Sequence, residues 1–205
     1  SGSSREAIEA GPYVEAFNKR KLEVIYTLEP IDDFALSHLG EFAGKKLVSA
    51  DRADLELPEE SSADEAKQDE AEKEGLSGDR LTGLTAWMQE VLGDRIKAVH
   101  VSKRLEGSPA IIVNADGYMT SSMERVMQAS RQDSGVAGLS GKNLEINPRH
   151  ELIVSLDKLR EEDREFAGSV VEQIHDNAMI QAGLTVEPQS MVERSYRILA
   201  RVVQK

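Results

Sequence analysis

The fold is decided by two stretches near the C-terminal end, DREFAGSVVEQIHDNAMIQAG (163–183) and PQSMVERSYRILARVVQ (188–204). Apolar residues recur in both at the three- and four-residue spacing of one helix face, which predicts two helices separated by Gly183 and Pro188. A hairpin of two helices cannot bury apolar faces of this breadth by itself. We therefore expect it to pack on a partner, either the rest of its own domain or a second copy of the chain.

Upstream of these helices, residues 79–150 predict a small sheet with helices around it. A helix from Asp79 ends at Gly93, as helices often do before glycine. Strands are expected at 96–101, 110–113 and 144–146, a helix at about 119–130, and another helix capped by Asn147 and Pro148.

The first part of the chain predicts a helix, strand, helix, strand unit. The expected elements are a helix at 12–19, a strand at 22–26, a helix from Pro30 to about 41, and a strand at 46–49. Such a unit is too small to stand alone and is more naturally the edge of a larger α/β domain. The chain as a whole is therefore expected to be α+β.

An acidic segment separates the two parts. Residues 59–74 hold eight acidic residues and two lysines, a net charge of −6. Such a run is typical of a solvated linker, and docking of a basic partner is the alternative. We divide the chain into an α/β part (1–57), an acidic linker (58–78) and a C-terminal domain (79–205).

Composition and spacing exclude several functions. A net charge of −12 argues against nucleic acid as a partner, and the absence of cysteine removes thiolate chemistry. No apolar run approaches the roughly 20 residues that span a bilayer, so we expect no membrane partner and a cytoplasm-like compartment. No two of the four histidines have helical metal-site spacing, and His175 beside Asp176 does not face it. We expect no catalytic, cofactor or metal site, with a small α/β enzyme as the alternative to an interaction protein.

One other pattern indicates function. The apolar residues Met119, Met123, Val126 and Met127 fall on one helical stripe. Methionine adapts to varied apolar surfaces, so the stripe predicts either contact with the protein's own sheet or a site for varied apolar partners.

Several runs resemble the heat-shock protein 90 family of chaperones, nearest its bacterial HtpG type and its mitochondrial relatives. They are EVIY (23–26), PIDDF (30–34), GKKL (44–47), LEINPRH (144–150) and NAMI (177–180). The resemblance implies the end of a middle domain, then a C-terminal dimerisation domain. It also implies an ATP-driven clamp whose nucleotide domain, with ATP and magnesium, lies outside this chain.

The resemblance further implies two contact surfaces. The first is a homodimer contact formed by the last two helices, residues 163–204, and its expected residues are Val171, Ile174, Ala178, Met191, Ile198, Leu199 and Val202. The second is a surface for unfolded or partly folded client proteins, expected at Phe34, Met119, Met123, Val126 and Met127. The family resemblance places the protein in the bacterial cytoplasm, with an organellar matrix as the alternative.

Overall fold

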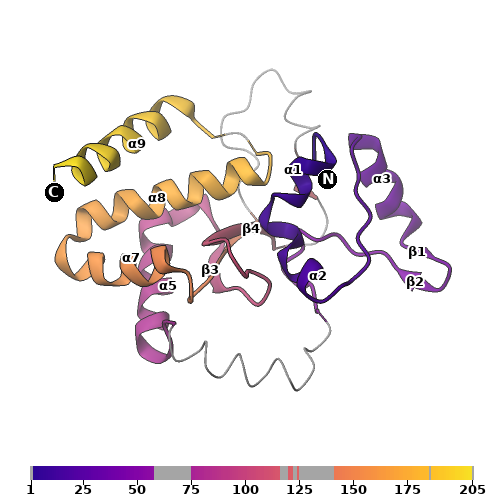
Figure 1. Cartoon of the computed structure of the whole chain (residues 1–205), viewed down its shortest axis with the longest axis horizontal. Coiled ribbons are helices and arrows are strands. Elements are labelled where there is room, and N and C mark those ends of the chain that lie inside the picture. Colours follow the sequence, from indigo (N-terminus) through magenta and orange to yellow (C-terminus); the bar gives the residue numbers. More distant parts are fainter. Residues whose placement is uncertain are drawn as a thin grey trace.

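The computed structural model (Figure 1) describes residues 2–57, 75–115, 120–121, 124, 141–184 and 186–204. It has an α+β fold. Its centre is a sheet of β3 (Ala98–Val101), β4 (Ala110–Asn114) and β5 (Lys142–Ile146), in the order β3-β5-β4. β5 runs parallel to β3 and antiparallel to β4.

Three helices cover one face of this sheet: α5 (Gly78–Leu92), α7 (Glu151–Glu162) and α8 (Arg164–Gln181). Side chains alternate along a strand, so Ile112 and Leu144 face these helices while Ile111 and Val113 face the other way. The main core lies between the helices and the sheet, and it includes Trp87 and Met88 from α5. The predicted strands at 96–101, 110–113 and 144–146 are confirmed to within two residues at each end.

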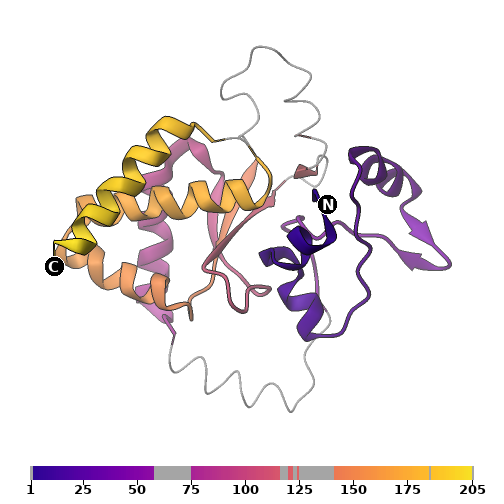
Figure 2. The same cartoon turned by 45° about the horizontal axis from the view of Figure 1, so that its top comes forward.

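The first part of the chain lies on the opposite side of the sheet, where its 3-10 turn contacts β4. It contains α1 (Arg5–Glu9), a 3-10 turn (Pro12–Val14), α2 (Glu15–Lys19), α3 (Pro30–Leu39), and the short hairpin of β1 (Glu41–Phe42) and β2 (Lys45–Lys46). A smaller core cluster of Leu105, Ile111 and Val113 lies on this side of the sheet, and Tyr13 packs against it. The Tyr13 hydroxyl donates a 2.6 Å hydrogen bond to the Ile112 carbonyl. Figure 2 shows the sheet between this part and the helices.

Three local predictions are wrong. Residues 22–26 form no strand, because no described residue offers this segment a ladder of backbone hydrogen bonds. The strand at 46–49 is reduced to Lys45 and Lys46. The helix after β5 begins at Glu151 and not at Pro148, because His150 supplies the cap: its Nδ1 accepts a hydrogen bond from the Leu152 N–H.

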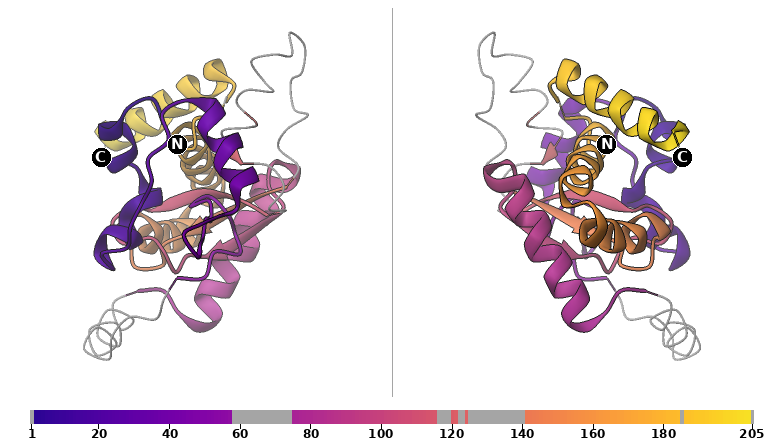
Figure 3. Two further views of the ribbon diagram at one scale, coloured as in Figure 1. Left: turned by 90° about the vertical axis from the view of Figure 1, so that its right-hand side faces the viewer. Right: turned by 90° about the vertical axis from the view of Figure 1, so that its left-hand side faces the viewer.

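The last helix, α9 (Pro188–Val203), lies on α8. Gly183 has a φ of 72°, which favours glycine, and the chain turns there after α8. Pro188 stands at the first turn of α9, and the Glu187 carboxylate accepts hydrogen bonds from the N–H groups of Gln189 and Ser190. Figure 3 shows that α8 separates α9 from the sheet, so α9 has one face on α8 and the other toward solvent.

Candidate interaction surfaces

The solvent-facing side of α9 is apolar. Four residues spaced by four, three and four positions form what we call the outer stripe: Val192, Tyr196, Leu199 and Val203. Their exposed fractions are 49%, 69%, 55% and 82%, and the neighbouring Val202 is 64% exposed. A continuous exposed apolar face of this kind is typical of a protein–protein contact.

Charged side chains hold the opposite side of α9 against α8. Arg194 is only 8% exposed, and its guanidinium contacts two carboxylates of α8. Nη1 lies 2.5 Å from Asp176 Oδ2, and Nε lies 3.0 Å from Glu172 Oε2. The other oxygen of Glu172 accepts a 2.5 Å hydrogen bond from Arg95. One buried guanidinium therefore joins two helices through two carboxylates.

A second arginine, seven residues later on the same face of α9, also pairs with a carboxylate at the start of α8. Arg201 donates to Asp163, and its guanidinium carbon lies 4.6 Å from the centre of the Phe166 ring. Asp163 also caps the start of α8 by accepting the Phe166 N–H. α9 is thus anchored near its middle and near its end by arginines on one face.

The Asp176 carboxylate is ionised in this setting. Burial raises its pKa, but hydrogen bonds from His175 and Arg194 outweigh burial and hold the pKa of Asp176 below its ordinary value. His175 lies beside it with Nδ1 3.0 Å from Asp176 Oδ1. The negative charge that Arg194 needs is therefore retained well into mildly acidic solution.

The structure divides the expected dimer residues into two groups. Val171, Ile174 and Ala178 are 0%, 4% and 2% exposed and belong to the chain's own core. Met191 and Ile198 are half-buried, whereas Leu199 and Val202 are exposed. Val171, Ile174 and Ala178 therefore have no surface exposed for contact with a second chain. Among the expected dimer residues, the exposed apolar side chains belong to α9.

Sequence reasoning missed two features of this surface. It did not include Tyr196, although its position four residues after Val192 puts it on the same stripe. It also missed Arg194 and Arg201, whose seven-residue spacing was the available signal. The identity of their carboxylate partners depends on the packing of α9 on α8, which spacing does not reveal.

Phe34, expected at the client surface, lies on α3 and is 49% exposed. Its ring centre is 4.1 Å from that of His38. The adjacent Asp33 accepts a hydrogen bond from the Thr120 hydroxyl, which ties α3 to the chain next to the methionine stripe. Met119, Met123, Val126 and Met127 lie outside the described residues, so their part of this surface stays a prediction.

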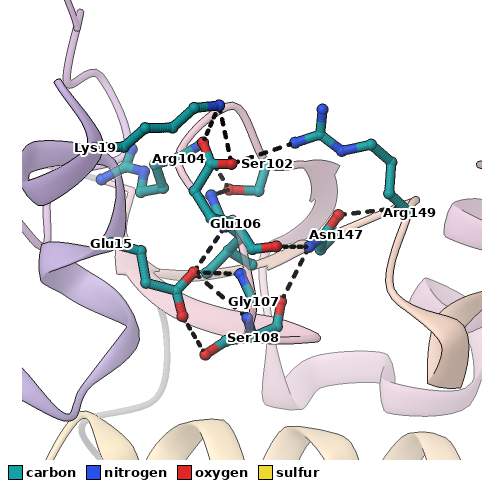
Figure 4. A network of polar contacts seen from close by, with 10 residues as sticks. Glu15, Lys19, Ser102, Arg104, Glu106, Gly107, Ser108, Asn147 and Arg149 are labelled. Atoms are coloured by element: carbon teal, nitrogen blue, oxygen red, sulfur yellow. Dashed lines mark hydrogen bonds and ion pairs between the residues drawn. The ribbon is translucent and has the colours of Figure 1, made fainter. Parts of the chain in front are cut away.

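A polar joint, shown in Figure 4, connects α2 to the loop between β3 and β4. Glu15 Oε2 accepts hydrogen bonds from the N–H groups of Glu106, Gly107 and Ser108 at 2.7, 3.0 and 3.4 Å. Glu15 Oε1 accepts the Ser108 hydroxyl at 2.5 Å. Burial raises the pKa of Glu15, but these hydrogen bonds outweigh it and lower the pKa overall.

Arg104 forms the other half of this joint. It is 5% exposed and donates to the carbonyls of Ala50, Arg52 and Ala53. It also pairs with Glu145 of β5, at 3.1 Å. The first part of the chain is therefore attached to the sheet by buried hydrogen bonds as well as by apolar contact.

One cavity of about 320 Å³ lies between the first part of the chain and the end of α8. Two carboxylates border it, and both already have partners. Asp33 holds Thr120, and Asp51 accepts hydrogen bonds from Ser49, Asn114 and the Ser121 N–H. These carboxylates thus have a structural role that accounts for their position.

Among the residues that the structure describes, no three or more His, Asp or Glu side chains are grouped so that they could hold a metal ion. No helix within the same described ranges has the length and apolar character to cross a bilayer.

Residues 1–205 match the family model described as "Hsp90 protein". The chain therefore belongs to the Hsp90 family. It is similar to two proteins named "Chaperone protein HtpG". The one from Desulfotalea psychrophila is 55% identical over 207 residues, covering 100% of this chain and 33% of the relative. The one from Desulfitobacterium hafniense is 42% identical over 204 residues, covering 100% and 32%.

A mitochondrial protein is also similar. "Heat shock protein 75 kDa, mitochondrial" from Rattus norvegicus is 35% identical over 207 residues, covering 98% of this chain and 28% of the relative. The chain spans about a third of the length of the curated relatives that it matches. The family resemblance inferred from runs within residues 23–47 and 144–180 is confirmed.

Proposed function

We propose that this chain is the dimerisation and client-contacting region of an ATP-dependent molecular chaperone, and that two copies associate through α9. The observation that carries the dimer proposal is the outer stripe, which places four apolar side chains in water on one helix face. The names of the relatives support a chaperone. ATP and magnesium would be bound by regions outside this chain, and we place the protein in a bacterial cytoplasm or an organellar matrix.

The size of the outer stripe suits a symmetric contact. Burying an exposed leucine or valine side chain contributes about 1.5–3 kcal/mol, and a two-fold axis uses each residue twice. Exchange of Leu199 for aspartate removes this contribution from both copies. Because Leu199 is 55% exposed in a single copy, about half of its burial remains to be gained on association, so we expect Leu199→Asp to weaken association by about 2–3 kcal/mol, which is roughly 30- to 100-fold in Kd.

Sedimentation velocity over a dilution series tests this expectation. Ser155→Asp is the matched control, because Ser155 is exposed on α7 and receives the same charge away from α9. We expect the control to keep the Kd of the unmodified chain. If Leu199→Asp has the same mass as the unmodified chain at every dilution, α9 does not form the contact.

The client surface is proposed at Phe34 together with Met119, Met123, Val126 and Met127. Its support is the exposed Phe34 ring, the attachment of Thr120 to Asp33, and the family resemblance. The alternative is a dimerising interaction module without chaperone activity. The double variant Met119→Ser/Met123→Ser separates the two, since a chaperone should lose binding of an unfolded client protein while it stays folded. Unaltered client binding by the folded variant would remove this surface from the proposal.

A further inference from the structure

α9 is turned opposite to the usual orientation of a surface helix. An amphipathic helix beside its own domain normally buries its apolar face and leaves charged residues in water. Here the buried residue of α9 is Arg194, while Tyr196 and Leu199 are 69% and 55% exposed. The main core cluster contains no residue of α9. Burial in the main core therefore does not fix the rotation of α9.

The charge cluster around Arg194 has the geometry to fix that rotation. The guanidinium carries donors in a rigid, planar fork, so contact with two carboxylates restricts its direction. Glu172 and Asp176 are one turn apart on α8, and Arg194 contacts both. The remaining oxygen of each carboxylate is already paired, with Arg95 and His175 respectively. Arg194 thus completes a set in which every carboxylate oxygen has a partner.

Rotation of α9 by half a turn about its axis would break the contacts of Arg194 with Glu172 and Asp176. Leu199 and Val203 lie on the helix face opposite Arg194, so they would take its place above α8. An aliphatic side chain donates no hydrogen bond, and the Glu172 and Asp176 carboxylates would lose a charged partner at a partly buried site. The cluster therefore disfavours the orientation in which α9 hides its own apolar face.

We propose that Arg194 is a positioning residue that sets the rotation of α9 about its axis and so determines which face is offered to a second copy of this chain. This inference rests on the proposed dimer. It assigns the buried arginine a role in specificity, because a buried ion pair is often no more stabilising than neutral residues of similar shape.

The test is a neutral version of the cluster, Arg194→Met/Glu172→Gln/Asp176→Asn, which removes the charge of Arg194 together with those of its two carboxylates. Arg95 loses the carboxylate of Glu172 in this variant, but its side chain is 40% exposed and water can solvate its charge. We expect its dimer Kd, measured by sedimentation velocity, to rise about tenfold or more. Its monomer stability, measured as the thermal midpoint in a Leu199→Asp background, should stay within about 4 °C of that background. Arg197→Met is the matched control, because Arg197 is an exposed arginine of the same helix, and its Kd should not change.

The outcomes separate this inference from the dimer proposal. A folded neutral variant that dimerises with the Kd of the unmodified chain overturns the positioning role and leaves the dimer standing. An unmodified chain that never dimerises overturns both. If the neutral variant fails to fold, Arg194→Lys replaces it, since lysine keeps the charge without the fork. A Kd raised severalfold for Arg194→Lys supports the inference, and an unchanged Kd overturns it.

Discussion

The joint between α2 and the β3–β4 loop gives a quantitative prediction at Glu15. Glu15→Gln keeps the shape of the side chain and removes its charge. A hydrogen bond to a charged group contributes about 1.5–3 kcal/mol, against about 0.5–1.5 kcal/mol for a neutral pair. Glu15 accepts three N–H groups and one hydroxyl at a partly exposed site. We therefore expect the variant to lose about 2 kcal/mol of unfolding free energy at neutral pH.

The pH dependence of this difference identifies its cause. Because the folded-state pKa of Glu15 is lowered, its contribution to stability is present above the usual glutamate pKa of 4.5. The contribution is lost as the pH falls through the lowered folded-state pKa, where protonated Glu15 resembles glutamine. Urea unfolding of both proteins from about pH 7 to about pH 3 should therefore show the two stabilities converging.

The control for Glu15 is an exposed acid. Glu90 pairs with Arg164 at the surface, and its side chain is 72% exposed. Glu90→Gln should change the unfolding free energy by no more than about 0.5 kcal/mol. Our interpretation of the joint is refuted if Glu15→Gln is as stable as the unmodified chain at pH 7, or if the loss does not shrink with acidity.

Two further substitutions test the interior. Arg104→Met should lower the free energy of unfolding in urea by about 3–5 kcal/mol, because it leaves the 7% exposed Glu145 carboxylate without its charged partner, which the neutral Ser102 hydroxyl does not replace; a loss below about 1 kcal/mol would contradict this. Ile112→Ala should lower the free energy of unfolding by about 2–5 kcal/mol in the same measurement, because the Ile112 side chain of β4 is fully buried in the main core against the helices. Unchanged stability would contradict the position of the core.

Elements with strong periodicity could be predicted from the sequence. The helix that begins near Asp79, the three strands and the last two helices all appear, because their apolar spacing matches the faces that the sheet and helices bury. The predictions fail where the structure of a segment depends on contacts with residues distant in the sequence. Residues 22–26 have strand-forming side chains, but a strand also needs a neighbour. Asn147 has the character of a helix cap, and its Oδ1 accepts the Arg149 N–H, but the helix itself begins only at Glu151. The amide nitrogen of Asn147 donates to the carbonyls of Glu106 and Ser108.

The candidate surfaces were partly predictable for a similar reason. Apolar stripes are visible in a sequence, but the side of a helix that its own domain buries is not. The stripe through Val171 and Ile174 is covered by the sheet and α5, whereas the stripe through Leu199 is left exposed. The difference arises from Arg194, whose carboxylate partners lie 18 and 22 residues earlier in the sequence.

The most direct test of the proposed contact uses the absence of cysteine from the chain. Tyr196→Cys would place a single thiol on the outer stripe, and Ser155→Cys would place one on the exposed side of α7. The rate of reaction with a thiol reagent should fall for Tyr196→Cys as protein concentration rises through the dimer Kd, because a second copy covers the stripe. The Ser155→Cys rate should stay constant. A Tyr196→Cys rate that is also independent of concentration would contradict association through α9.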